Sequence, residues 1–461
     1  MFIFPIFYVG LFITSLFYLS QKQQKGIFLF LLFGLPIYII SLSVAHMYGF
    51  GKMVPFMQSF KEASILLYLG FALFSLKVNE TKWHLLDKIM VALFFYNLLY
   101  VPLPIGSYSF FERVLAFKSL SFFPLVYFTG RLIKADQILI TEIYHYIALF
   151  TIAAAAVLFV EVITYTHIQT ISGYAGYNEY FFDQTPNGSY GLTWTFEIEN
   201  GMKRFASFFS TPLELASASL VSLSAIAAIV TNKDNSFTFN KWTITAFIAS
   251  LFCIGFALSR ASFASYFIIL YTYAWLTNKK IILRIIHFGL ISVIAMFLIV
   301  SFNNDFVDFI INTLNFSNAS SVGHLIEWAN GIESMILHPL GIGLGESGRI
   351  SAFSGFNTGG ENEFIILGVQ TGIITLGLYI AAYVVILKTS YQLFKTSEGR
   401  IRRLALFLYL LKIGLIIPLF TSEAEAVIYV SYTTWILTGL LINMSSRKES
   451  LMEKAIINES I

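Results

Sequence analysis

The strongest constraint on this chain is a series of apolar runs, each about 17–25 residues long and almost free of charge. A helix of that length crosses the hydrocarbon core of a bilayer. The composition agrees, because 57% of the 461 residues are hydrophobic and only 12% are charged, against about 25% in a typical soluble domain. We therefore expect an all-α polytopic membrane protein with 12–13 transmembrane helices, near residues 2–19, 26–45, 60–76, 89–105, 117–131, 144–163, 211–231, 242–258, 262–277, 283–302, 364–387, 404–420 and 425–443.

The basic residues alternate between successive connections. Of the 29 lysines and arginines, 20 fall in every second connection or in the C-terminal tail, eight fall in the other connections, and Lys412 lies inside a predicted helix. Membrane proteins keep positive charge on the cytoplasmic side. The pattern predicts an N-terminus outside the cell and a C-terminus in the cytoplasm.

Two of the predicted outer connections are unusually long, and loops of such length are usually functional. They divide the chain into N-terminal transmembrane helices, a first long outer loop, central helices, a second long outer loop with short surface helices, C-terminal helices and a cytoplasmic tail. The corresponding residues are 1–163, 164–210, 211–302, 303–363, 364–443 and 444–461.

Arg260 is the only charged side chain between Lys241 and Lys279. That stretch is too long for one span, so we expect a helical hairpin that turns at Ser259–Ser262 and places Arg260 at the outer membrane boundary. One interpretation is an arginine whose stem lies along the apolar surface while its head binds carbonyls at a helix end. The other is a binding residue for an anionic head group.

Arg204 strengthens the second interpretation. It precedes Thr211-Pro212-Leu213-Glu214, which has the form of a helix N-terminal capping box with proline in the first turn. Arg204 should therefore lie at the same depth as Arg260. Two guanidinium groups at that level suit a diphosphate, because the planar fork binds phosphate oxygens in pairs. The alternative is that Lys203 and Arg204 form an ordinary basic pair beside the membrane.

Glu361 and Glu363 lie in the segment "ENEFIILGVQTGIITLG", at the predicted first turn of a transmembrane helix. Acidic residues at that position can simply complement the helix dipole. A carboxylate held near cations at a membrane surface is also a plausible general base.

The second long loop contains "HLIEWANGIESMIL", whose apolar residues recur with helical spacing. We expect a short helix on the membrane surface. Its residues His324 and Trp328 are candidate substrate-binding residues, together with Glu363 and Arg349, the one arginine of this loop. An equally good interpretation is that the helix only anchors the loop.

Several classes of function are not indicated. No basic tract with interleaved aromatic residues points to nucleic acid. Cys253 is the single cysteine, and His324 and His338 are too far apart for ligand spacing, so we predict no metal site and no cofactor.

Four motifs occur in a suggestive order: "RFASFFSTP", "LSRASF", "GHLIEWANGIESMILHPLGIGLG" and "ENEFIILGVQTGIITLG". Together, over residues 200–390, they resemble the O-antigen ligase and O-antigen polymerase superfamily. The resemblance implies a GT-C-like, metal-independent membrane glycosyltransferase in the bacterial cytoplasmic membrane. Its donor and acceptor would be polyprenyl diphosphate-linked oligosaccharides within membrane lipid, with other polysaccharide-assembly proteins as possible partners.

The resemblance also assigns roles to residues. One family arginine precedes the helix after the first long loop and matches Arg204, and a second lies in the S-R-G/A hairpin and matches Arg260. Both hold the diphosphate leaving group in the family. Glu361 stands where the ligases carry histidine, which favours a polymerase that joins repeat units into a surface polysaccharide (O-antigen, capsule or exopolysaccharide), with Glu361 as the first candidate base and Glu363 as the second.

Two alternatives stay open. An O-antigen-type ligase would use the same donor but transfer a finished glycan to another acceptor. A lipid-linked oligosaccharide flippase would be a non-enzyme with its diphosphate site in a central cavity, with charges inside the spans.

Overall fold

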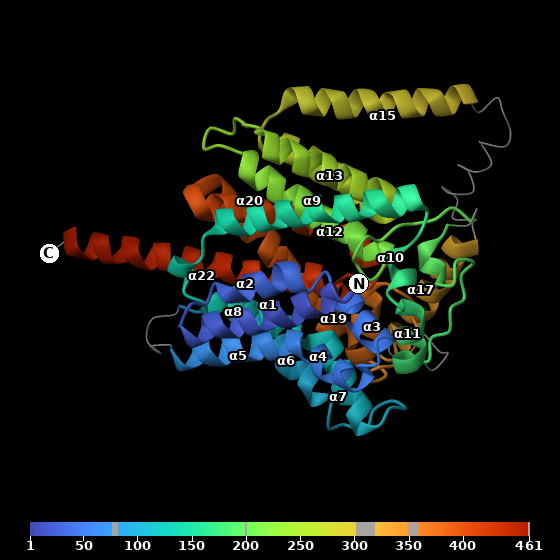
Figure 1. Cartoon of the computed structure of the whole chain (residues 1–461). Helices are drawn as coiled ribbons and strands as arrows, with labels where there is room; N and C mark the ends of the chain where they lie inside the picture. Colours follow the sequence, from blue (N-terminus) through green and yellow to red (C-terminus); the bar gives the residue numbers. More distant parts are fainter. Residues whose placement is uncertain (76–81, 199–200, 301–318, 349–350, 352–357, 460–461) are drawn as a thin grey trace.

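The computed structural model of this chain describes residues 1–75, 82–198, 201–300, 319–348, 351 and 358–459. In these residues the regular structure is helical, with two isolated β-bridges, which confirms the all-α prediction. The axes of most of the long helices are roughly aligned, parallel or antiparallel, so the molecule has two distinct ends (Figure 1).

The N-terminal third supplies most of one side of the bundle. Its helices are α1 (Ile3–Ser20), α2 (Gly26–Leu29) with η1 (Phe30–Gly34), α3 (Tyr38–Met47), η2 (Gly51–Met53), α4 (Val54–Gln58), α5 (Phe60–Phe74), α6 (Leu85–Leu99), α7 (Phe110–Ser121), α8 (Phe123–Leu132), η3 (Ala135–Gln137) and α9 (Ile140–Thr164).

Two predicted spans in this third are broken. The segment near 26–45 bends by 66° between Gly34 and Tyr38. The segment near 117–131 forms α7 and α8, which meet at Phe122.

The first long loop contains α10 (Ile168–Ile171), α11 (Tyr174–Phe182) and η4 (Trp194–Phe196). The central helices follow as α12 (Pro212–Val230), α13 (Lys241–Ala257), α14 (Arg260–Leu276) and α15 (Lys280–Val300). The predicted cap of α12 is confirmed, because the Thr211 side chain accepts a hydrogen bond from the Glu214 backbone N–H at 3.3 Å.

The C-terminal part begins with α17 (Ala319–Leu337), which crosses the end of the bundle (Figure 1). It continues with α19 (Glu363–Thr396), α20 (Gly399–Gly414), α21 (Ile416–Thr421), η5 (Ala424–Ala426) and α22 (Ile428–Glu459). The predicted helix of the second long loop is thus confirmed. Leu325, Ile332 and Ile336 are exposed on α17, whereas Trp328 and Met335 are half-buried, and the position of this helix on a membrane surface stays a prediction.

Helix α19 is broken at Gly372, whose backbone angles are φ 85° and ψ 177°. The glycine-rich segment 339–348 occupies the break. The Ile342 N–H donates to the Val369 carbonyl at 2.8 Å, and the Ile373 N–H donates to the Pro339 carbonyl at 2.9 Å. The break therefore exposes backbone groups that this loop satisfies.

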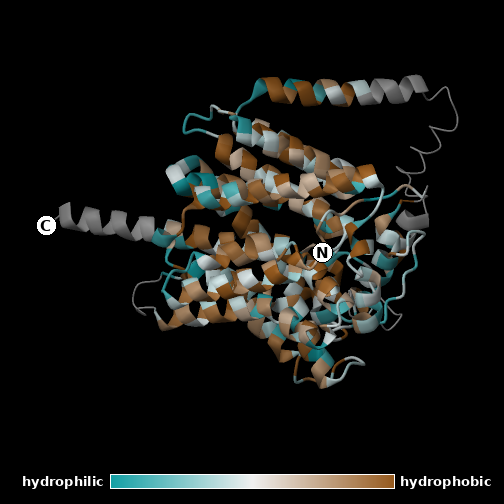
Figure 2. Ribbon diagram, viewed as in Figure 1, coloured by the Kyte–Doolittle hydropathy of each residue, from teal (hydrophilic) through white to brown (hydrophobic). Residues whose placement is uncertain are grey.

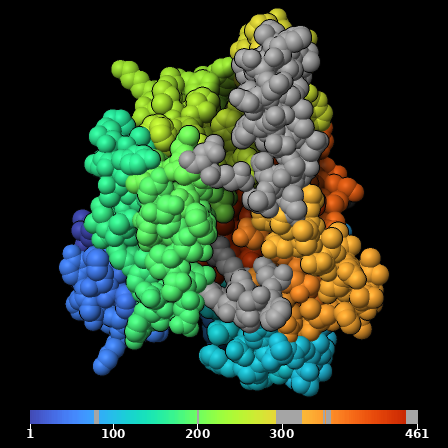
Figure 3. Space-filling model, turned by 90° about the vertical axis from the view of Figure 1, so that its right-hand side faces the viewer, coloured from blue at the N-terminus to red at the C-terminus, as the bar shows by residue number. Residues whose placement is uncertain are grey.

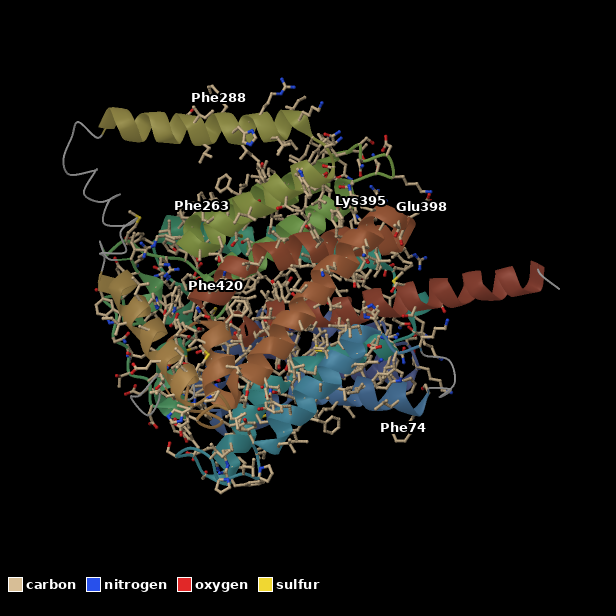
Figure 4. The ribbon with its side chains drawn as sticks, turned by 180° about the vertical axis from the view of Figure 1, so that it is seen from behind. Phe74, Phe263, Phe288, Lys395, Glu398 and Phe420 are labelled. Carbon is tan, nitrogen blue, oxygen red and sulfur yellow. The ribbon has the colours of Figure 1, made fainter. Side chains whose placement is uncertain are left out.

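Each of the thirteen predicted apolar segments contains helix within its described residues, although the segment near 89–105 ends its helix at Leu99. By length and composition, five helices of the described chain can cross a membrane, or six if the bent pair counts as one span. Large apolar side chains also face outward: Phe74 is 95% exposed and Phe288 is 73% exposed (Figure 4). Such surfaces suit lipid rather than water, and the chain is a multi-pass membrane protein. The number of spans, 12–13, stays a prediction.

The two ends of the molecule carry different connections. We call one the loop end, and among the described residues it carries 47–53, 100–108, 164–198, 201–210, 338–348, 351 and 358–361. Here Tyr100 donates to the Leu340 carbonyl, and the His46 and Tyr180 rings lie 4.9 Å apart.

At the opposite end, Lys233 pairs with Glu398 at 3.1 Å, and the Lys134 N–H binds Gln24. Polar residues gather toward both ends of the mainly apolar helices (Figure 2). The predicted outer loops therefore share one end, and the N-terminus lies on that side (Figure 1).

Candidate functional site

The hairpin predicted around Arg260 is present. Helix α13 ends at Ala257, and Leu258 turns the chain with φ 48°. Ser259 then caps α14 by accepting a hydrogen bond from the Ser262 N–H at 3.4 Å. Arg260 is the first residue of α14, and its side chain is exposed at the loop end.

Arg204 binds the C-terminal end of α13, the helix that precedes Arg260. Its Nε donates to the Ala257 carbonyl at 3.1 Å, one of the carbonyls that α13 leaves without an intrahelical partner. Its own backbone is also held, because the Arg204 N–H donates to the Phe196 carbonyl at 2.8 Å, and the neighbouring Phe205 N–H donates to Phe256 at 3.1 Å. The helix-end role considered for Arg260 is thus filled by Arg204.

Glu161, near the end of α9, fastens the segment that carries Arg204. Its two carboxylate oxygens accept the N–H groups of Ile168 at 2.8 Å and Ser207 at 2.7 Å. The side chain is buried and both bonds are short, so they hold the loop firmly. They join both ends of the first long loop to one helix, which fixes the position of Arg204.

The two arginines influence each other electrostatically. Burial, and then the positive charge of Arg260, lower the pKa of Arg204 to about 10. Both effects disfavour the cation, although the guanidinium stays charged at neutral pH. An anion bound beside the pair would offset this cost.

The start of α19 separates the two candidate carboxylates. Asn362 is the buried N-cap and accepts hydrogen bonds from Phe364 at 3.0 Å and Ile365 at 3.2 Å. Glu361 lies before the cap and is exposed, so its predicted place in the first turn is wrong. Glu363 is in the first turn and is buried; one of its oxygens accepts the Glu425 N–H at 3.2 Å.

A small cavity of about 30 Å³ opens beside Glu363. It brings together Glu363, Glu423 and Glu425, and it is also lined by Ala116, Ser119, Leu120, Ser347, Gly348, Ile366, Gln370 and Ala426. The sequence alone assigned no role to Glu423 and Glu425. The paired carboxylates of "TSEAEAV" were the available signal. No cluster suited to a metal ion occurs among the described residues.

Helix α17 places His324 and Trp328 beside the turn before α19. His324 Nδ1 lies 3.6 Å from Glu327 Oε2. Gly360 leaves room for Glu327, because a β-carbon there would lie 2.3 Å from the same oxygen. Trp328 is half-buried, and within the described residues its Nε1 has no hydrogen-bond partner. Arg349 lies outside the described residues.

The structure brings Arg204 and Arg260 together, and it separately brings Glu363 next to Glu423 and Glu425. Helix α14 contacts α21, and the ring of Phe420 in α21 lies against that of Phe364 in α19, with the centroids 4.7 Å apart and the planes tilted by 44°. The loop end is hollowed between the first long loop and α17, and C-terminal residues are visible in the hollow (Figure 3). That Glu361 meets both arginines in one opening stays a prediction.

The chain was compared with known proteins. It matches no protein-family model and no curated protein.

Proposed function

We propose that this protein is a membrane glycosyltransferase of the GT-C-like kind that joins polyprenyl diphosphate-linked oligosaccharide units into a polysaccharide. The observation that carries the proposal is the Arg204–Arg260 pair at the loop end. The half-buried Arg204 binds the end of α13, and Arg260 stands exposed at the start of α14.

The arginine pair supplies the electrostatic part of the reaction. When the bond between the anomeric carbon and the diphosphate breaks, negative charge builds up on the leaving phosphate. Guanidinium groups held in place by the fold stabilise that charge more in the transition state than in the ground state. Arg204 is preorganised by its bond to Ala257, and Arg260 is free to bind phosphate oxygens as a fork.

The acceptor hydroxyl must lose its proton as it attacks. Glu361 and Glu363 are the candidate bases at the start of α19. Burial favours Glu363, because its carboxylate is held beside a cavity with room for water, whereas Glu361 is exposed. His324 and Trp328 lie on the neighbouring helix and would contact the acceptor glycan, together with Arg349.

The proposal is tested in cells whose own copy of the protein is replaced by variants. Arg260→Ala, Arg260→Lys, Glu361→Gln and Glu363→Gln are compared for polymer and for lipid-linked single units, with membrane insertion checked separately. Lys52→Ala removes an exposed cation in another connection of the loop end and is the control.

We expect the Arg260 variants to lose long polymer while single units accumulate outside, and the two glutamine variants to identify the base. Normal polymer in an inserted Arg260→Ala protein would contradict the proposal. Full-length polymer that is not attached to its final acceptor indicates a ligase. Single units retained inside indicate a flippase.

A further inference from the structure

Lys412 is a fully buried lysine in the middle of the bundle. It lies in α20, and its ammonium nitrogen is 3.8 Å from the ring centroid of Trp435 and 4.8 Å from that of Tyr383. Among the described residues it makes no direct ion pair. A buried charge held mainly by aromatic faces is costly, and an ionisable residue at membrane depth usually has a functional role.

Glu425 is the carboxylate that interacts electrostatically with Lys412. It lies in the turn between α21 and α22. Its oxygens accept hydrogen bonds from Tyr379 at 2.7 Å, Ser431 at 2.6 Å and the Trp435 indole at 2.8 Å. Trp435 therefore contacts both charges, with its ring against Lys412 and its N–H on Glu425.

Two cavities meet at Glu425. The inner cavity, of about 10 Å³, is lined by Lys412, Glu425, Tyr383, Ser431 and Thr434 among other residues. It has room for about one water molecule. The outer cavity is the one described above, of about 30 Å³, and it is lined by Glu425 and Glu363. Glu425 is thus the link between a buried lysine and the cavity that contains the candidate base.

We propose that Glu425, held beside Lys412, receives the proton in a path that begins at Glu363 in the outer cavity. The proposal rests on the proposed function. The hydroxyl proton of the acceptor passes to the Glu363 carboxylate while the hydroxyl oxygen bonds to the anomeric carbon. The bond from that carbon to the diphosphate breaks, and its electron pair leaves with the diphosphate.

The proton then moves from Glu363 through water in the outer cavity to the Glu425 carboxylate. Lys412 gives up no proton in this path, and its positive charge attracts the Glu425 carboxylate. After the diphosphate has left, the proton returns through the same cavity to bulk solvent. Glu363 is thereby restored as a base without waiting for solvent to reach it.

The titratable and charged groups that face this pair come from several elements. They are Glu363, Tyr379 and Tyr383 from α19, and Glu423 from the turn after α21. Helix α22 contributes Ser431, Thr434 and Trp435, which are not charged.

The first experiment needs no substrate. Purified full-length protein in lipid nanodiscs is titrated with acid while tryptophan emission is recorded, and the Trp435→Phe spectrum is subtracted. We expect a step in Trp435 emission that is absent in Glu425→Gln and lies at higher pH in Lys412→Met. A step that persists in Glu425→Gln overturns the proposed proton exchange at Glu425.

The second experiment measures kcat, KM and the pH profile of polymer formation. We expect folded Glu425→Gln and Lys412→Met to lower kcat about 10–100-fold with little change in KM. Glu425→Asp should recover part of the loss, and Glu333→Gln, an exposed carboxylate on α17, is the control.

An unchanged kcat and pH profile in Glu425→Gln overturns the path while the proposed function stands. Polymer formation that is unaffected by Arg260→Ala overturns the proposed function, and the transfer step with it. The double variant Lys412→Met/Glu425→Gln removes both charges together. Its thermal stability shows whether either single variant fails only because one buried charge is left unpaired.

Discussion

The Nε of Arg204 donates a hydrogen bond to the carbonyl of Ala257 across 3.1 Å, and so joins the first long loop to the end of α13. Ala257 is also three residues before Arg260, so this bond holds Arg204 near Arg260. The guanidinium is therefore both a structural cap and a candidate phosphate ligand. These two roles can be separated by substitution.

Arg204→Lys should keep a charge but lose the planar donor fork, and Arg204→Ala should lose both. We expect Arg204→Ala to lower the free energy of unfolding by about 1.5–3 kcal/mol, because a helix-end carbonyl loses a charged donor. Arg204→Lys should retain more stability but bind polyprenyl diphosphate lipid more weakly than the parent. Thermal unfolding and native mass spectrometry with that lipid check the two effects. Equal lipid binding by Arg204→Lys and the parent would contradict the assignment.

The break in α19 predicts a glycine requirement at position 372. Gly372 has φ 85°, and a β-carbon there would lie 2.5 Å from the Pro339 carbonyl oxygen. We expect Gly372→Ala to destabilise the protein by about 1–3 kcal/mol. Gly377→Ala is the matched control, because it lies in the same helix with open space around it. Equal melting temperatures for the two variants would show that segment 339–348 does not depend on the break.

Helices α8 and α22 cross at two glycines. A β-carbon on Gly130 would lie 1.9 Å from the Ile436 carbonyl oxygen, and one on Gly439 would lie 2.0 Å from the Tyr127 carbonyl oxygen. Gly439→Ala should therefore push the helices apart and lower the thermal stability. In Gly70→Ala, a helical glycine with no close neighbour, the melting temperature should stay the same or rise. A melting temperature of Gly439→Ala as high as that of Gly70→Ala would contradict this packing.

His167 predicts acid sensitivity of the first long loop. Burial, and then the charge of Lys203, lower the pKa of His167 to about 4, whereas the unfolded side chain titrates near its ordinary value of 6.5. Between these pH values the unfolded state binds more protons, so stability falls as the pH drops from about 6.5 to about 4. His167→Phe should remove this slope while it keeps the ring contacts with Phe196 and Phe205. Unfolding measured over a pH series checks it, and an identical slope in His167→Phe would rule out His167 as its origin.

The sequence determined the helical segments and several of their ends. Apolar runs long enough to span a bilayer must satisfy their own backbone groups, so each forms a helix. The hairpin at Ser259–Ser262 follows from an apolar run that is too long for a single span. The cap at Thr211 follows from a threonine hydroxyl that is followed by proline and glutamate.

Only the tertiary structure decided which distant polar groups meet. Glu425 binds Glu363 from 62 positions away, and Arg204 reaches Ala257 from 53 positions away. Apolar periodicity reports which residues avoid water, but it carries no information on which helix lies beside which. The break at Gly372 was likewise hidden, because the glycine-rich loop that satisfies its backbone comes from earlier in the chain. Pairing of buried polar groups depends on the packing of the whole bundle, and that packing placed Lys412 and Glu425 around two adjoining cavities.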